Sequence, residues 1–254
     1  MDLKLNGKVA LVTGAGSQVG FGKGIALILA ESGADIIAND IDKEGAEKTA
    51  AAVAKLGRKS MAIKADITRM PEVQSMIDTV MKEFGRIDIL VNNAGRTTAP
   101  IPFVDTPQKN WEIVFNLNVF GTFNCAKAVL PHMIARKYGK IINIVSGAAF
   151  DGSPRFIHYG ATKGAILTFT RGLAKENVAY GINVNAVAPG IGDTNFLSTG
   201  GFPEGEINKV IPMIPTGRST TPEDVGNLVA FLASDVSSNI VGQVIVVDGG
   251  CLMP

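Results

Sequence analysis

Short apolar runs without polar alternation recur along the chain, and a longer amphipathic stretch follows nearly every one of them. A strand that is apolar at every position is buried on both faces, which is typical of a parallel sheet covered by helices on both sides. The expected strands are 8–13, 35–40, 60–66, 87–92, 140–146, 183–188 and 243–248. The pattern therefore predicts an α/β fold, a doubly wound parallel sheet of seven strands with the order of a Rossmann-type domain.

Helices are expected between these strands, and we place them at 22–32, 43–56, 71–84, about 107–137, about 157–179 and 222–234. No linker, repeat, low-complexity tract or charge block divides the chain, so we expect one domain over residues 1–254. The segment 191–219 is rich in Gly, Pro, Ser and Thr, and a loop of that length in a compact domain is typically a functional lid. A plain surface excursion is the alternative for this segment.

Composition excludes several classes of protein. Hydrophobic residues make up 46% and charged residues 19% of the 254 residues, an ordinary balance for a domain with a large core. The net charge of +1 predicts no strongly basic face, so we expect no nucleic-acid partner. Cys125 and Cys251 form neither a disulfide framework nor a zinc spacing, which fits a reducing cytoplasm, and no cluster suggests a catalytic metal.

The chain shows no targeting or membrane signal. Residues 1–7 lack the basic segment followed by an apolar one that marks a signal peptide. No uninterrupted apolar run approaches the ~20 residues that a bilayer requires. We therefore expect a soluble, cytoplasmic protein without a membrane partner.

A glycine-rich turn, residues 13–22, lies between the first expected strand and the first expected helix. Glycines let the backbone approach a pyrophosphate closely, and the helix N-terminus supplies N–H donors and a positive dipole end. Such a turn alone is weak evidence, but its place after the first strand favours a dinucleotide site. The candidate contacts in it are Gly14, Ser17, Gln18, Gly20 and Gly22.

Asp40 ends the second expected strand, where a carboxylate can accept hydrogen bonds from the adenosine ribose hydroxyls. It would repel a 2′-phosphate, and no Arg or Lys lies between Gly14 and Gly22, so NAD is favoured over NADP. Asp66 and Ile67, after the third strand, are expected near the adenine. The alternatives are a solvated strand end for Asp40 and a turn cap for Asp66.

The run Asn92-Asn93-Ala94-Gly95 closes the fourth expected strand with residues that favour turns. In a doubly wound sheet this strand end borders the ligand crevice. Asn93 and Gly95 are therefore candidate cofactor contacts, and a tight turn without a ligand is the alternative.

Tyr159 and Lys163 lie four positions apart on a predicted helix and so share one face. A phenol with a pKa near ~10 is a poor acid–base catalyst at neutral pH, but a nearby ammonium favours the phenolate and should lower that pKa. Ser146 ends the preceding expected strand, where its hydroxyl could hydrogen-bond a substrate oxygen. A Tyr–Lys pair occurs by chance in many helices, but its combination with Ser146 and the glycine turn indicates an oxidoreductase.

Together these motifs resemble the short-chain dehydrogenase/reductase family, in its branch with a Ser-Tyr-x-x-x-Lys active site. The resemblance covers nearly the whole chain and rests on residues 13–22, Asp40, Asp66, residues 92–95, Asn118, Ser146, Tyr159, Lys163 and Pro189-Gly190. It implies reversible hydride transfer between NAD and a secondary alcohol or ketone. Tyr159 would pass the proton, Ser146 would orient the substrate oxygen, and Lys163 would also bind the nicotinamide ribose.

The resemblance implies further roles that the residues alone do not indicate. Asn118 resembles the helix asparagine that supports a water relay to the lysine. Pro189, Gly192 and Thr194 belong to a segment, residues 189–194, that meets the nicotinamide carboxamide and the pyrophosphate. The long helices resemble those that pack between subunits, which implies a homotetramer.

One departure from the family pattern concerns the glycine turn. Five residues separate Gly14 from Gly20, where the family's short branch usually has three, and this spacing is similar to that of the enoyl reductases. Those enzymes place lysine seven positions after tyrosine, and residue 166 here is Ile. Carbonyl–alcohol chemistry is therefore favoured, with a double-bond reductase and a non-catalytic NAD-binding protein as alternatives.

The substrate pocket is expected to involve Arg96, Arg155 and His158. Either arginine could recognise a carboxylate, sulfonate or phosphate. Thr97, Thr98, residues 147–156 and residues 191–215 are expected to shape the pocket, but the sequence does not indicate which alcohol it takes.

Overall fold

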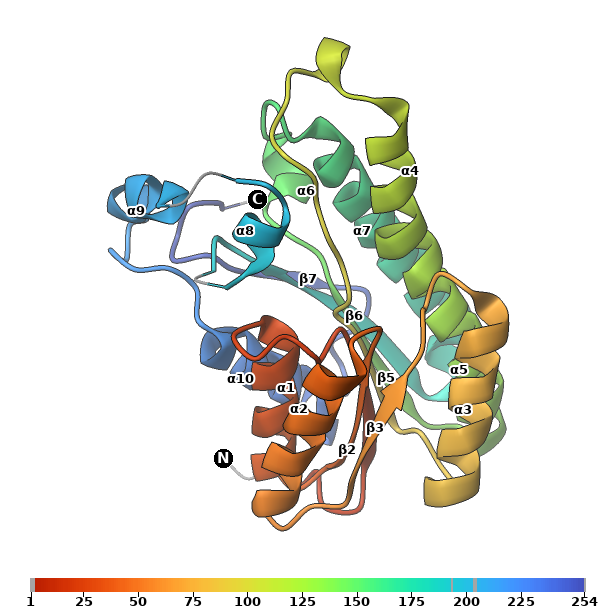
Figure 1. The fold of residues 1–254 in the computed structure, drawn as a ribbon. Coiled ribbons are helices and arrows are strands. Elements are labelled where there is room, and N and C mark those ends of the chain that lie inside the picture. The colour runs from red at the N-terminus through yellow and green to blue at the C-terminus, as the bar shows by residue number, and fades with distance from the viewer. Residues whose placement is uncertain (1–2, 193, 203–204, 254) are drawn as a thin grey trace.

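A seven-stranded parallel sheet forms the centre of the computed structural model, which describes residues 3–192, 194–202 and 205–253 (Figure 1). The strand order is β3-β2-β1-β4-β5-β6-β7. The strands are β1 (Val9–Thr13), β2 (Asp35–Asp40), β3 (Ser60–Lys64), β4 (Ile89–Asn92), β5 (Gly139–Ile144), β6 (Ile182–Pro189) and β7 (Val244–Val247). The predicted doubly wound α/β fold is confirmed.

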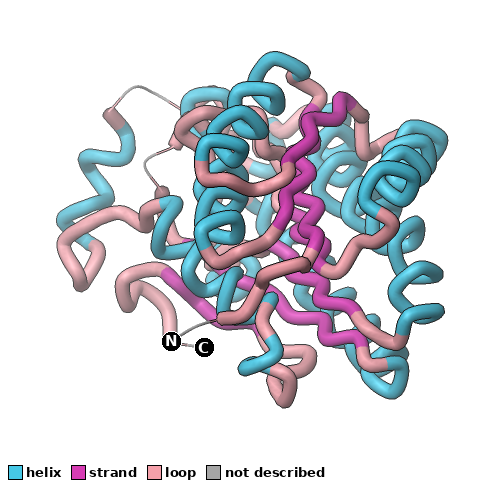
Figure 2. Tube along the Cα trace, turned by 90° about the horizontal axis from the view of Figure 1, so that it is seen from below, coloured by secondary structure: helices cyan, strands magenta, loops and turns pink. Residues whose placement is uncertain are grey.

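Helices cover both faces of the sheet, so that the strands run through the interior (Figure 2). They are α1 (Phe21–Glu31), α2 (Lys43–Lys55), α3 (Met70–Phe84), α4 (Gln108–Phe115), α5 (Thr122–Arg136), α6 (Ala148–Asp151), α7 (Ile157–Asn177), α8 (Phe196–Thr199), α9 (Glu206–Val210) and α10 (Pro222–Ala233). Short 3-10 turns lie at Phe103–Asp105, Val178–Tyr180, Ile211–Met213 and Asp235–Ser237. One apolar cluster joins α1 and α10 to the sheet, and a second joins α3, α5 and α7 to its other face.

The winding of the chain reverses at β1, which pairs with β2 on one side and with β4 on the other. In open parallel sheets, ligands bind outside the carboxyl ends of the strands at such a switch point. The loops that follow β1, β4, β5 and β6 all begin at this edge. The fold therefore gathers the glycine turn, the Asn-Asn-Ala-Gly run and the region of Ser146 at one place.

The single helix expected at about 107–137 is divided. A π-helical segment, Asn116–Gly121, separates α4 from α5. Gly121 lets the side chain of Ile67 approach its backbone, because a Cβ at this position would lie 2.7 Å from Ile67 Cδ1. Wide π turns inside α-helices are often found at functional sites, and this one carries Asn118.

The helical stretch Gln108–Arg136 is long and apolar enough, by length and composition, to cross a membrane. Half of its most apolar window is buried inside this fold. Cys125, Val129 and Met133 lie in the cluster against α3 and the sheet. The stretch thus packs as a core helix.

The segment 191–219 is not a structureless loop. It contains α8, α9 and one 3-10 turn, and the structure describes it except for residues 193, 203 and 204. Asp193, within the segment expected to meet the nicotinamide, lies outside the described residues. Arg218 makes a bidentate ion pair with Asp224 at the start of α10, which fixes the end of this segment.

A buried carboxylate, Asp88, holds the amino-terminal edge of the sheet together. It is fully buried and accepts hydrogen bonds from Arg86, Arg136 and the backbone N–H of Val9. Burial raises the pKa of Asp88, but these donors outweigh burial and lower it below its ordinary value.

We predict that Asp88→Asn lowers the free energy of unfolding by about 3 kcal/mol, because two arginines lose the charge that they surround. Urea denaturation at pH 7 measures this change. The matched variant Asp78→Asn, on the exposed face of α3, should change stability by less than ~0.5 kcal/mol. Equal effects of the two substitutions would contradict the role of Asp88.

The stabilisation that the ionised Asp88 gives the folded state is fully present above the pKa of this carboxyl in the unfolded chain. It is lost as the pH falls through the lower pKa that Asp88 has in the folded protein.

Candidate active site

The glycine turn joins the end of β1 to α1 in close contact with the end of β4. Gly14 has a φ of +67°, and a Cβ there would lie 2.7 Å from the Cα of Ala94. Gly22 packs directly against the carbonyl of Gly14, with no room for a side chain. No side chain caps the N-terminus of α1, and its first turn has no acidic residue. Such a helix start can accept an anion, so the turn fits a pyrophosphate.

The lengthened part of the turn is tied to α2. The side-chain amide of Gln18 donates to the carbonyls of Gly16 and Gly45, and Lys23 donates to its oxygen. Thr49 on α2 donates to the carbonyl of Ala15. The two additional residues are therefore accommodated by packing toward α2, and the Gln18 amide serves that packing.

Asp40 lies at the end of β2, as expected, and faces the glycine turn. Its Oδ2 accepts a 2.7 Å hydrogen bond from Gly16 N–H, and its Oδ1 accepts one from Asp42 N–H. A Cβ at Gly16 would lie 2.7 Å from the Asp40 Cγ, so glycine is needed there. Each carboxylate oxygen has two lone pairs, so Asp40 keeps acceptor capacity for hydroxyl groups.

Asp66 and Ile67 lie beyond β3, which ends at Lys64 rather than at residue 66. Asp66 Oδ1 accepts from both the N–H and the hydroxyl of Thr68, so one oxygen of this carboxylate caps a turn. Ile67 is buried in the core against Gly121.

The run after β4 locks two strand ends together. The side-chain amide of Asn93 donates to the carbonyls of Thr13 and Gly14. Gly95 lies beside the helices on the other side, because a Cβ there would be 3.5 Å from Lys163 Nζ and 3.3 Å from Asn118 Oδ1. The run thus connects the glycine turn to the Tyr–Lys helix.

Ser146, Tyr159 and Lys163 meet at the carboxyl end of β5. Ser146 lies two residues beyond the strand, which ends at Ile144, and its hydroxyl opposes the rise in the pKa of the Tyr159 phenol. Lys163 Nζ lies 5.6 Å from the centre of the Tyr159 ring and donates a 2.8 Å hydrogen bond to the carbonyl of Ile144. The predicted common face of Tyr159 and Lys163 is present in the structure.

Burial governs the ionisation of this pair. Tyr159 and Lys163 are only 6% and 5% exposed. Burial raises the pKa of Tyr159 to about 12, against the opposite effect of the Ser146 contact, and lowers the pKa of Lys163 to about 8. The expectation of a lowered phenol pKa is wrong for the protein groups taken together, because desolvation of the phenolate outweighs the opposing effect of the Ser146 hydroxyl.

Asn118 lies in the π-helical segment, buried between two parts of the site. Its Oδ1 accepts from Arg96 N–H, and its amide donates to the carbonyl of Arg96 and to the hydroxyl of Thr162 on α7. Asn118 therefore holds the loop after β4 against the helix that carries Tyr159 and Lys163.

The segment after β6 lies against the glycine turn. Ser17 Oγ donates to Asn195 Oδ1, and a Cβ at Gly192 would run into the ring of Phe21. Pro189 ends β6, and the N–H of Thr194 donates to the carbonyl of Gly192. Segments far apart in the sequence thus meet at the same edge of the sheet.

The three substrate candidates differ in their surroundings. Arg96 and Arg155 are exposed, and neither forms a salt bridge with any residue that the structure describes. Arg155 has a φ of +63° and its carbonyl accepts from Ile101 N–H. His158 is buried, its Nε2 is 2.8 Å from Thr98 Oγ1, and burial lowers its pKa.

The aromatic residues around Tyr159 lie in the two ranges, 147–156 and 191–215, that are expected to shape the substrate pocket, although no motif singles out any one of them. The ring of Phe156 lies 4.6 Å from the ring of Tyr159, and that of Phe196 on α8 lies 5.5 Å from it, centre to centre. Phe202 packs edge-on against Phe156. Phe156 could have been found from its place three residues before Tyr159, but no sequence signal places the rings of the 191–219 segment.

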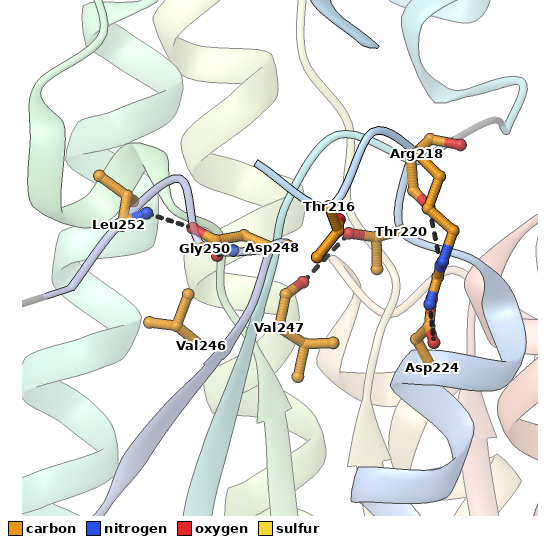
Figure 3. A pocket seen from close by; sticks show the side chains of 11 residues that line it. Thr216, Arg218, Thr220, Asp224, Val246, Val247, Asp248, Gly250 and Leu252 are labelled. Atoms are coloured by element: carbon orange, nitrogen blue, oxygen red, sulfur yellow. Dashed lines mark hydrogen bonds and ion pairs between the residues drawn. The ribbon is translucent and has the colours of Figure 1, made fainter. Parts of the chain in front are cut away.

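A cavity of about 310 Å³ lies apart from these residues, at the carboxyl end of β7 (Figure 3). Its walls include the Arg218–Asp224 ion pair and Thr220, whose hydroxyl donates to the carbonyl of Val247. None of the predicted site residues lines it. These bonds attach the end of the 191–219 segment to β7 and α10.

Comparison with known proteins places this geometry in a family. A family model described as "Enoyl-(Acyl carrier protein) reductase" matches residues 14–251. The 3-oxoacyl-[acyl-carrier-protein] reductase FabG of Thermotoga maritima is 38% identical over 99% of this chain and 100% of its own length. The 2-dehydro-3-deoxy-D-gluconate 5-dehydrogenase of Escherichia coli is 39% identical, over 98% of this chain and 96% of its own length.

Solved structures agree with these relatives. A 7α-hydroxysteroid dehydrogenase complexed with NADH and 7-oxo glycochenodeoxycholic acid superposes with a TM-score of 0.91 at 34% identity. That match covers 98% of this chain and 96% of the other. The enoyl reductases would have their lysine at position 166. Ile166 is 2% exposed here and packs in the core. The relatives named above do not favour the enoyl alternative either. The arrangement of Ser146, Tyr159 and Lys163 and the similarity over the whole chain establish that this protein is an oxidoreductase of the short-chain dehydrogenase/reductase family.

Proposed function

We propose that this protein is an NAD-dependent dehydrogenase that interconverts a secondary alcohol and a ketone. One observation carries the proposal. Ser146, Tyr159 and Lys163 lie together at the carboxyl edge of the sheet, beside the glycine turn. NAD bound there would supply the hydride acceptor for oxidation and, when reduced, the hydride donor for reduction. Gly14, Gly20, Gly22, Asp40 and the segment 189–194 are the residues proposed to hold it.

The chain's own groups supply the proton transfer. In oxidation, the Tyr159 phenolate takes the hydroxyl proton of the alcohol as the carbon–hydrogen bond breaks, and in reduction the phenol returns it. Ser146 holds the substrate oxygen beside the phenol. The Lys163 ammonium favours the phenolate, and Asn118 holds Arg96 and the neighbouring loop against α7.

Several finer assignments belong to the same proposal. We assign Ser17, Gln18, Asp66, Ile67, Asn93 and Gly95 to the walls of the cofactor site, and Arg96, Arg155 and His158 to the substrate side. Exposed apolar side chains such as Ile113 on α4 and Phe120 in the π-helical segment support assembly into a homotetramer. Buried Cys125 and exposed Cys251 are both free thiols, which suits a cytoplasmic protein.

The first test of the proposal replaces the acid–base group. Tyr159→Phe should lower kcat about 10²–10⁴-fold while leaving the Kd for NADH within a few-fold, because only the proton transfer is lost. Steady-state rates and NADH fluorescence titration measure the two quantities. Tyr180→Phe, at an exposed tyrosine, is the matched control and should leave both unchanged.

A rate in Tyr159→Phe equal to that of the unmodified protein would reject the assignment. Binding of NADH without oxidation of any secondary alcohol in a broad panel would instead favour the non-catalytic alternative. Reduction of enoyl thioesters without reduction of ketones would favour the double-bond reductase.

The second prediction concerns the choice of cofactor. The Asp40 carboxylate would repel a 2′-phosphate, so kcat/KM should be much higher with NAD than with NADP. Asp40→Asn should lower the NAD/NADP ratio of kcat/KM by on the order of tenfold or more, since a repulsion of even ~1.4 kcal/mol corresponds to that factor. Asp42→Asn, which removes a charge two residues away, should leave the ratio within about twofold. An unmodified protein that uses NADP equally well would contradict the preference.

The third prediction concerns pH. Oxidation needs the phenolate, so kcat/KM should rise with pH along a limb that belongs to the coupled Tyr159–Lys163 pair. Lys163→Met removes the ammonium and should move this limb to higher pH. The rate should fall more at pH 7 than at pH 10, because burial lowers the pKa of Lys163 to about 8 and the lysine is charged mainly below that pH. Lys175→Met, at the exposed end of α7, should leave the limb in place. Superimposable profiles for Lys163→Met and the unmodified protein would contradict the coupling.

A further inference from the structure

Three phenylalanine rings form a connected cluster with the ring of Tyr159. Phe156 immediately precedes α7, Phe196 begins α8, and Phe202 follows α8. Phe156 and Phe196 both contact the tyrosine ring, and Phe156 and Phe202 meet edge to face at 5.4 Å between ring centres. Each of the three is only half-buried, so part of its surface is accessible.

Phe156 and Phe196 lie where they would border the carbon skeleton of a substrate bound at Tyr159. A reacting oxygen within hydrogen-bond reach of Tyr159 and Ser146, about 3 Å from each, places the carbons next to it within a few ångströms of the phenol's neighbours. We call Phe156, Phe196 and Phe202 the aromatic wall. Phenylalanine offers no hydrogen bond, so the hydroxyl groups of a hydroxylated skeleton at this wall would lose their hydrogen bonds to water without replacement. The wall therefore favours an apolar skeleton.

The polar groups beside the rings already donate hydrogen bonds within the protein. The hydroxyls of Ser198 and Thr199 donate to the carbonyl of Asn195. The Thr97 hydroxyl donates to the carbonyl of Thr98, whose own hydroxyl is paired with His158. These hydroxyls are thus engaged within α8 and the loop after β4, so that, beside the exposed Arg155, the aromatic rings are the surface left to contact the substrate.

We propose that the substrate of this protein carries its secondary alcohol or ketone on, or next to, an apolar ring, aromatic or alicyclic, that packs against Phe156, Phe196 and Phe202. Aromatic rings prefer edge-to-face or offset-stacked neighbours, and the existing edge-to-face pair of Phe156 and Phe202 already has such a geometry. The inference rests on the proposed function, because it takes Tyr159 as the group that meets the reacting oxygen.

The test compares alcohols of matched size with NAD. Relative kcat/KM values are measured for 1-phenylethanol and 2-octanol, which have equal carbon numbers, for 4-methylcyclohexanol, and for xylitol as a polyol. We expect both ring alcohols to exceed 2-octanol and xylitol by at least about tenfold, the factor that corresponds to one well-packed ring contact. Preference for 2-octanol or for xylitol, or equal values for all four, would overturn the inference.

Variants of the wall give an independent measurement. Phe196→Leu and Phe202→Leu should each lower kcat/KM for the ring alcohols about three- to tenfold, mainly through KM, and change that for 2-octanol less than about twofold. Phe84→Leu, at the end of α3 beneath Lys59, is the control and should leave all values unchanged. Equal losses for ring and open-chain alcohols would overturn the inference.

Failure of this inference is distinguishable from failure of the proposed function. If open-chain alcohols or polyols are oxidised and ring alcohols are not, the aromatic wall does not select the substrate, but the dehydrogenase assignment stands. If no alcohol is oxidised although NADH binds, the dehydrogenase assignment falls and the inference falls with it.

Discussion

The burial of Tyr159 and Lys163 side by side, against the carboxyl end of β5, is the constraint on which the rest of the site depends. Burial opposes both charged forms, since it raises the pKa of the phenol to about 12 and lowers that of the ammonium to about 8. The carbonyl of Ile144 compensates the ammonium with a 2.8 Å hydrogen bond. A charge placed next to this pair would act in a medium of low dielectric constant and so would shift its ionisation strongly. The ionisation of this pair is therefore expected to depend on what binds beside it.

The parts of the site support one another through short connections at one sheet edge. Asn93 joins the end of β1 to the end of β4, and Asn118 joins the loop after β4 to α7. Ser17 joins the glycine turn to the segment after β6, where α8 brings Phe196 to the phenol. Displacement of the glycine turn would therefore also displace groups at the Tyr159 phenol, because the segment after β6 contacts both.

Apolar strands and the residues at their ends could be predicted from the sequence because both are local. A run such as residues 89–92 is buried on both faces, and the position of a residue after a strand places it at a known edge of the sheet. The common face of Tyr159 and Lys163 follows from the helix period alone.

Features that depend on tertiary contacts could not be predicted in this way. The π-helical segment forms where Gly121 meets Ile67, which is distant in sequence, and the expected single helix is divided there. The phenol's raised pKa reflects the total burial of the site, which no pair spacing reveals. The approach of Phe196 to Tyr159 depends on the path of the 191–219 segment.

A crystal structure of the complex with NADH tests the central claim most directly. We expect the adenosine ribose to bind Asp40 and the pyrophosphate to lie at the start of α1. We expect the nicotinamide ring between the glycine turn and Tyr159, with the hydroxyls of the nicotinamide ribose within hydrogen-bond reach of Lys163 Nζ. A nicotinamide bound away from Tyr159, or a Lys163 that turns from the phenol when the dinucleotide is present, would contradict it.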